Sequence, residues 1–129
     1  MSVLRRIQFE DISAASYTIW SNKEIADKIA LEAYEIISNT SRRKFAFFNG
    51  KSSKCLVGGL FYLLGYRYND VKLQRELAKR LTTSDVTIRN SYRQWLGAFP
   101  DLFLDVIGKF AADDNLKFFV LLSLDHGTA

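Results

Sequence analysis

The segment 73–95 constrains the fold of this chain more than any other part of its sequence. It reads LQRELAKRLTTSDVTIRNSYRQW, two amphipathic stretches separated by a short polar turn. Apolar residues recur at helical spacing in both stretches, as Leu73, Leu77 and Leu81 in the first and as Ile88, Tyr92, Trp95 and Leu96 in the second. This pattern predicts a helix-turn-helix within 72–96, a motif whose second helix can enter the major groove of DNA.

The second stretch also carries a polar face opposite its apolar stripe. Residues spaced i, i+3, i+4 and i+7 on this face are Val86, Arg89, Asn90 and Arg93. Arginine can pair with guanine, asparagine with adenine, and valine can contact the methyl group of thymine. The face is therefore a candidate reader of bases. The same spacing fits equally well a helical hairpin whose polar face contacts only solvent.

The turn chemistry around this segment predicts where its helices begin and end. Asn69-Asp70 closes the preceding segment and is expected to cap the first helix. Thr82-Thr83 forms the turn, and Ser84 or Asp85 is the expected N-cap of the second helix.

Helical spacing recurs in the N-terminal half, where alternation typical of strands is scarce. Residues 9–20 predict one helix, and Ser21 or Asn22 is expected to cap another that runs through Ser38. Residues 39–51 are polar, then basic and aromatic, and are expected to form a loop or short turn.

A central helix is expected to begin at Ser52 or Ser53. From Cys55 to Tyr66 it is apolar almost all round, which is typical of the buried centre of an all-α domain. Gly58-Gly59 within it favours either close approach of a neighbouring helix or merely an irregular helix.

Charge is distributed unevenly along a chain whose net charge is +4. Two stretches are basic, and residues 101–129 are acidic, with five aspartates against Lys109 and Lys117. Phosphate is the natural partner of the basic part. Its cations are Arg42, Arg43, Lys44, Lys51 and Lys54 in the first stretch, and Lys72, Arg75, Lys79, Arg80, Arg89 and Arg93 in the second.

The residues do not support a disulfide, a zinc site, a phosphate-binding loop or a catalytic site. Cys55 is the sole cysteine and is expected to be a small buried hydrophobe, so neither a disulfide nor a zinc ribbon is encoded. Gly50-Lys51-Ser52 lacks the earlier glycine of a phosphate-binding loop, because Phe45 stands there. No arrangement of a serine or cysteine nucleophile accompanies His126, so we expect no catalytic role for it. We expect no enzyme activity, no metal, no cofactor and no membrane-spanning segment.

Four motifs, in order, resemble one protein family. Ser84–Arg93 (SDVTIRNSYR) is similar to the end of the second cyclin-like repeat of general transcription factor IIB and archaeal transcription factor B, and 73–78 (LQRELA) to that family's TQ(K/R)E(I/V)A helix. Residues 50–62 (GKSSKCLVGGLFY) resemble its central-helix signature, and 98–103 (AFPDLF) its PDLFP segment.

The resemblance implies an all-α, five-helix cyclin-like domain over 21–104. Outside it, the residues themselves predict an N-terminal helical segment over 1–20 and an acidic, partly helical tail over 105–129 that includes the apolar cluster 116–122. The resemblance implies partners as well: double-stranded promoter DNA beside the TATA box, and the TATA-binding protein. Base contacts fall on Val86 and Arg89, with Asn90 and Arg93 supporting them. Charge adds backbone contacts by Lys72, Arg75, Lys79, Arg80, Arg42, Arg43, Lys44, Lys51 and Lys54.

Departures from the family pattern limit this expectation. Ser53 replaces the usual proline, and bulkier residues follow Gly58-Gly59. No zinc ribbon, polymerase-engaging linker or first cyclin repeat is recognisable, so RNA polymerase is an expected partner only indirectly or through regions absent from this chain. The chain is either a domain of a longer factor or a single-repeat relative. The nucleus is the expected location, or the cytoplasm if the source is archaeal. The alternative function is a cyclin-box module that binds protein and does not read DNA sequence.

Overall fold

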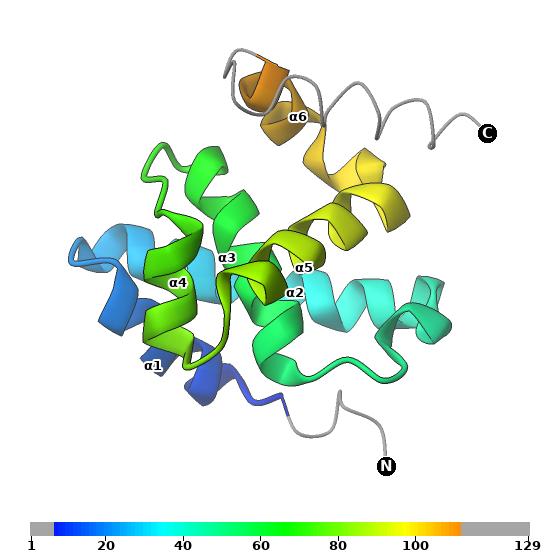
Figure 1. The fold of residues 1–129 in the computed structure, drawn as a ribbon, viewed down its shortest axis with the longest axis horizontal. Helices are drawn as coiled ribbons and strands as arrows, with labels where there is room; N and C mark the ends of the chain where they lie inside the picture. Colours follow the sequence, from blue (N-terminus) through cyan, green and yellow to red (C-terminus); the bar gives the residue numbers. More distant parts are fainter. Residues whose placement is uncertain (1–6, 112–129) are drawn as a thin grey trace.

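The computed structural model describes residues 7–111, and these fold into helices without any strand. Six α-helices and two 3-10 helices follow one another around a common core (Figure 1): α1 Phe9–Ile19, α2 Lys23–Arg43, η2 Phe45–Phe48, α3 Ser53–Arg67, α4 Gln74–Leu81, α5 Asp85–Ala98, η3 Pro100–Phe103 and α6 Leu104–Ala111. The all-α prediction is confirmed, and the arrangement fits a cyclin-like domain with six α-helices where five were expected. The predicted cluster at 116–122 and His126 lie outside the described residues.

Helix α3 is the buried centre of the domain, as its all-round apolar sequence predicts. Leu56, Leu60, Phe61, Leu63 and Leu64 are completely buried in it, with neighbours on several sides of the helix. Its first turn is capped by Ser52, whose hydroxyl oxygen accepts a hydrogen bond from the Cys55 N–H at 3.1 Å. Cys55 itself is only partly buried.

Helix α5 lies unusually close to α3, and the two glycines of α3 make this possible. A Cβ on Gly59 would lie 2.7 Å from the backbone carbonyl carbon of Ser91, and one on Gly58 would overlap the Ile88 side chain. Two side chains of α5 also donate to α3: the Ser91 hydroxyl to the Cys55 carbonyl, and the Trp95 indole N–H to the Leu56 carbonyl at 3.0 Å. Of the two explanations for Gly58-Gly59, close helix approach is therefore correct.

Helix α2 extends further than predicted, because part of the expected loop over 39–51 is helical. Asn22 is its N-cap and accepts from the Ile25 N–H at 3.2 Å, which confirms the predicted start. Near its end, the buried Thr40 hydroxyl donates to the Ile36 carbonyl at 2.6 Å, so this polar residue is satisfied within the helix. The helix continues to Arg43, and η2 then returns buried Phe48 to the core.

The predicted start of α4 is wrong by several residues. Asn69 has a positive φ of 58° and does not cap the helix; Leu73 is the N-cap and has no side-chain cap bond. The loop before α4 is instead anchored by a residue far away in the sequence. Its Asp70 carbonyl accepts a hydrogen bond from the Trp20 indole N–H at 2.9 Å. Leu73 is consequently 64% exposed and does not join the buried stripe that Leu77 occupies.

Helix α6 packs against the core, so the packed part of the chain continues past residue 104. Val106 and Phe110 are fully buried. The Arg67 guanidinium bridges Asp105, at 2.8 and 2.9 Å, and Glu32 of α2. The Lys109 ammonium donates to the carbonyls of Tyr66 and Arg67 at 2.8 and 3.0 Å, at the C-terminal end of α3.

Replacing Gly59 by alanine tests the close approach of α3 and α5. The added methyl group meets the backbone of Ser91, which cannot move away cheaply, so we expect Gly59→Ala to lower the free energy of unfolding by about 1–3 kcal/mol. Urea unfolding followed by circular dichroism measures it. Gly97→Ala is the matched control, because nothing lies within 4 Å of its Cβ position; it should change stability by at most about 1 kcal/mol, in the stabilising direction. Equal effects at the two sites would contradict the packing.

The Arg67–Asp105 pair predicts a pH dependence. The hydrogen bond from Arg67 holds the pKa of the Asp105 carboxyl below its ordinary value of 3.8, although partial burial opposes the shift. A lowered pKa adds stability that is complete above the unfolded pKa and is lost as the pH falls through the folded pKa.

We therefore expect Asp105→Asn to lower the free energy of unfolding at pH 7 by at most about 1 kcal/mol, because the pair is partly exposed to solvent. The difference from wild type should shrink as the pH falls below about 4. Urea unfolding of both proteins across this range checks it. A difference that is constant with pH would mean that the charge of Asp105 contributes nothing.

Candidate nucleic-acid interface

Helices α4 and α5 form the predicted helix-turn-helix. The turn reverses at Thr82, which has a left-handed φ of 57°, and the Thr83 N–H donates to the Ala78 carbonyl at 2.8 Å. Ser84 is the N-cap of α5, where its hydroxyl oxygen accepts from the Thr87 N–H at 3.1 Å. Both the turn at 82–83 and the cap at Ser84 are thus confirmed.

Helix α5 places its predicted faces as its spacing requires. The apolar stripe of Ile88, Tyr92, Trp95 and Leu96 is at most 2% exposed. On the other side, Val86 is 51% exposed, Asn90 and Arg93 are exposed, and Arg89 is half-buried. The four predicted base-contacting residues therefore share an accessible face of one rigidly held helix. Their contact with bases stays a prediction.

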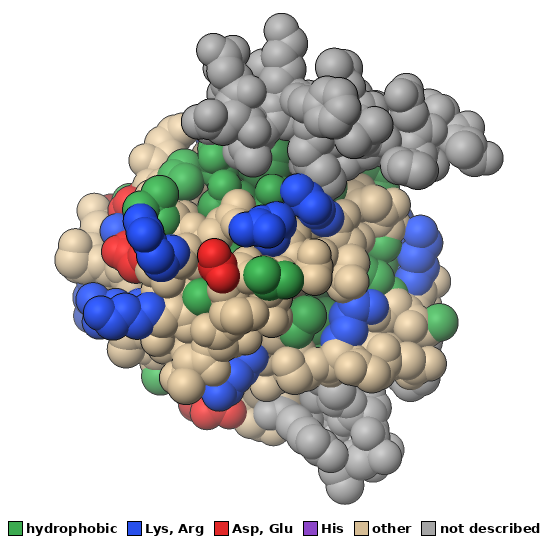
Figure 2. All heavy atoms as spheres, in the orientation of Figure 1, with side chains coloured by type: hydrophobic (Ala, Val, Ile, Leu, Met, Phe, Trp, Pro, Cys, Tyr) green, Lys and Arg blue, Asp and Glu red, His purple; other side chains and the backbone are tan. Residues whose placement is uncertain are grey.

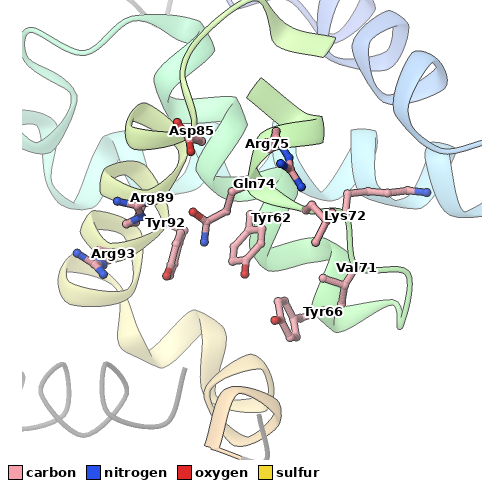
Figure 3. Close-up of a pocket in the computed structure, with 11 residues that line it drawn as sticks. Tyr62, Tyr66, Val71, Lys72, Gln74, Arg75, Asp85, Arg89, Tyr92 and Arg93 are labelled. Atoms are coloured by element: carbon pink, nitrogen blue, oxygen red, sulfur yellow. The ribbon is translucent and has the colours of Figure 1, made fainter. Parts of the chain in front are cut away.

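A cleft of about 560 Å³ lies beside this face, between α5, the start of α4 and the end of α3. Figure 3 shows the lining side chains on these three segments, with Gln74 between Tyr92 and Tyr62 and with Lys72 extending away from them. Arg89 and Arg93 line the cleft, whereas Val86 and Asn90 lie outside it. The other lining residues are Tyr62, Tyr66, Val71, Lys72, Leu73, Gln74, Arg75, Asp85 and Tyr92.

Three tyrosines that line this cleft were not among the predicted site residues. Tyr62 and Tyr66 were included in a uniformly apolar helix, although their i, i+4 spacing places both on one side of α3. Tyr92 belongs to the buried stripe and also lines the cleft. Burial raises the pKa of the Tyr92 phenol above its ordinary value of 10.0.

The basic residues of α4 and its approach fall on two sides of the helix. Lys72 and Arg75 line the cleft, and Lys72 also lies 3.6 Å from the Asp70 carboxylate. Lys79 lies with Arg75 in a neighbouring hollow next to the turn. Arg80 and Lys54 instead line an apolar hollow against α1. Figure 2 shows lysine and arginine side chains spread over the face that α4 and α5 form, with a few acidic and apolar side chains between them.

The basic run 42–54 does not form a single surface. Arg43 pairs with Asp101 at 3.2 Å, and Lys44 donates to the Ala98 carbonyl at 2.7 Å. The cations of both lie over the Phe99 ring, at 5.2 and 5.4 Å from its centre. The Lys51 ammonium donates to the Phe47 carbonyl and lies over the Phe47 ring. Arg42 lies apart from these, in a hollow beside Tyr34. Two of these cations thus contact the C-terminal end of α5, which gives them a role within the fold.

Similarity to curated proteins covers a 78-residue stretch of the chain. Transcription initiation factor IIB of Aeropyrum pernix is 36% identical over 60% of this chain and 24% of its own length. Transcription initiation factor IIB 3 of Halobacterium salinarum is 30% identical over the same shares. Transcription initiation factor IIB of Haloarcula vallismortis is 31% identical over 60% of this chain and 67% of its own length. The chain belongs to the transcription initiation factor IIB family.

The family assignment rests on sequence relatives alone. No protein-family model matches the chain, and no solved structure matches it. The alignment spans about a quarter of the length of the first two relatives and two thirds of the third. These relatives are archaeal proteins, which fits the cytoplasmic alternative and gives the nucleus no support.

Two features are absent from residues 7–111. No helix in this range is long and apolar enough to cross a membrane. Likewise, no three histidine, cysteine or acidic side chains in the described part of the chain gather closely enough to hold a metal ion.

The Ser84 cap predicts how firmly the accessible end of α5 is held. Ser84→Ala leaves the first turn without its side-chain acceptor and should lower the free energy of unfolding by about 1 kcal/mol. Ser84→Asp, which restores an acceptor and suits the positive end of the helix, should unfold like wild type. Thermal and urea unfolding of the two variants measure this. If both variants lose the same stability, the hydroxyl does not act as a cap.

Proposed function

We propose that this chain is a DNA-binding domain of a transcription initiation factor IIB-type protein. In this proposal α5 lies in the major groove of promoter DNA next to the TATA box, and the domain binds the complex of that DNA with the TATA-binding protein. The family membership supports a role in transcription initiation. The accessible face of α5 is the observation that carries the DNA-reading role.

Three properties of α5 favour base reading. Its first turns are accessible, since Val86 is half exposed and Asn90 is exposed, and residues near the start of the second helix are those that reach base edges in this motif. The helix is fixed to α3 by direct hydrogen bonds from Ser91 and Trp95. A helix held in this way does not need to become ordered when it binds, which lowers the entropic cost of recognition.

The cations around this face support contacts with the DNA backbone. Arg75 and Lys79 are exposed on α4 next to the turn, on the flank of α5. Phosphate contacts of this kind position a protein on DNA without reading its sequence, and each makes binding more sensitive to salt. Arg80 and Lys54 would reach only DNA that bends around the domain, as DNA bent by the TATA-binding protein does.

A protein-binding cyclin-box module is the second candidate, and the cleft is the observation that favours it. Val71 and Leu73 are 44% and 64% exposed there. An accessible apolar surface of this kind is more typical of protein partners than of phosphate. This candidate predicts no salt-dependent affinity for DNA.

Arg89→Ala tests the base-reading role. On the preferred duplex we expect a loss of about 1–3 kcal/mol in binding free energy, with a smaller loss on random duplex, because a bidentate contact to guanine disappears. Gel shifts on TATA-containing promoter DNA, with and without TATA-binding protein, measure it. Lys28→Ala, an exposed cation on α2 paired with Glu24 at 3.1 Å, is the matched control and should bind like wild type.

A salt titration of the same binding separates the two candidates. Counterion release requires the affinity of a phosphate-contacting domain to fall steeply as salt rises, and Lys79→Ala should reduce the slope by about one unit. A flat salt dependence, or binding unchanged by Arg89→Glu, would favour the protein-binding module. Equal losses of Arg89→Ala on preferred and random duplexes would reduce Arg89 to a backbone contact.

A further inference from the structure

The cleft beside α5 contains two exposed apolar side chains among its basic residues. Leu73 is 64% exposed and Val71 is 44% exposed, and both line the cleft. Cations and hydrogen-bond donors recognise phosphate and sugar. A leucine side chain gains nothing from contact with phosphate. The cleft therefore fits a partner that carries apolar side chains as well as negative charge.

The described chain ends directly beside this cleft. Phe110 of α6 packs against three tyrosines that line it, with ring centres 4.5 Å from Tyr66, 5.9 Å from Tyr92 and 6.2 Å from Tyr62. Only Ala111 separates Phe110 from the residues that follow. The segment 112–129 therefore begins within a few residues of the cleft, and a short extended stretch of about 3.5 Å per residue reaches along it.

The composition of 112–129 complements that of the cleft. The segment has Asp113, Asp114 and Asp125 against a single Lys117. Its centre is apolar, with Leu116, Phe118, Phe119, Val120, Leu121, Leu122 and Leu124. The cleft has the opposite charge balance, because four cations and one aspartate line it. Acidic ends and an apolar centre match basic walls that surround exposed Val71 and Leu73.

We propose that segment 112–129 docks into the cleft, with its aspartates facing the arginines of the cleft and its apolar side chains covering Val71 and Leu73. Tethering favours this occupant over a free partner, because a short linker gives an effective concentration in the millimolar range. Docked there, the segment covers Arg89 and Arg93 and competes with DNA for α5. The competition rests on the proposed DNA-binding function, whereas the docking does not.

Paramagnetic relaxation in the full chain tests the docking. A nitroxide is attached through Ser123→Cys in a Cys55→Ser background, or in Cys55→Ala if the serine variant does not fold. The label should broaden the amide signals of 71–75 and 89–93 more than those around Tyr34, an exposed aromatic on α2 that packs against Phe9 of α1.

Leu73→Ser and Leu104→Ser form the matched pair of variants. These leucines are 64% and 66% exposed, and only Leu73 lines the cleft. Both variants should fold like wild type. Leu73→Ser should weaken the broadening at 89–93, and Leu104→Ser should leave it unchanged.

Several results would overturn the docking. Broadening that is absent from 71–75, or as strong around Tyr34, would exclude the cleft as the docking site. Broadening found only when ¹⁵N-labelled chain is mixed with spin-labelled unlabelled chain would assign the cleft to a second copy. Equal loss of broadening in both leucine variants would show that the apolar wall of the cleft has no specific role.

DNA affinity tests the competition separately. If the segment occupies the cleft in most molecules, Leu73→Ser should bind promoter DNA about threefold to tenfold more tightly than wild type, with no change in net charge. Leu104→Ser should bind like wild type. If docking is found in the wild-type chain and Leu73→Ser leaves the DNA affinity unchanged, the segment does not compete with DNA. A full chain that binds no DNA would instead refute the proposed function and leave the relaxation result standing.

Discussion

The close approach of α3 and α5 is the contact on which the rest of the domain depends. Two adjacent glycines bring the backbone of α5 to a distance that a side chain would block, and the first of them leaves room for Ile88. Two hydrogen bonds from Ser91 and Trp95 then fix the rotation of α5 on α3. Since α3 is buried on all sides, this orientation is set by the core and not by the surface. The accessible face of α5 is therefore a consequence of packing.

Local signals in the sequence were sufficient for most of the helix-turn-helix. The spacing of Ile88, Tyr92, Trp95 and Leu96 predicted the buried stripe, and Ser84 was a recognisable cap. These features depend on neighbours along the chain, so one sequence can reveal them. The class of the fold followed from the same periodicity, together with the uniformly apolar α3.

Tertiary contacts explain what the sequence could not predict. Leu73 continues the leucine spacing of α4, yet the loop before it is held by Trp20, far away in the sequence, and leaves Leu73 exposed. Helix α2 continues through the polar residues at its end, because Thr40 is buried and its hydroxyl is hydrogen-bonded within the helix. The cleft combines side chains of three helical segments. No local sequence pattern predicts that these segments lie side by side. Lys44, a predicted phosphate contact, also donates to the Ala98 carbonyl, and its charge alone did not reveal this role within the fold.

The base-reading face and the cleft share two arginines, which links the two proposed roles. Val86 and Asn90 lie on the outer side of α5, and Arg89 and Arg93 lie where that side meets the cleft. A negatively charged ligand in the cleft therefore lowers the positive potential at the face that would meet DNA, even where it does not block that face sterically. By linkage, DNA that draws both arginines outward weakens whatever binds in the cleft by the same factor. In the two proposals, DNA and the occupant of the cleft therefore compete for Arg89 and Arg93.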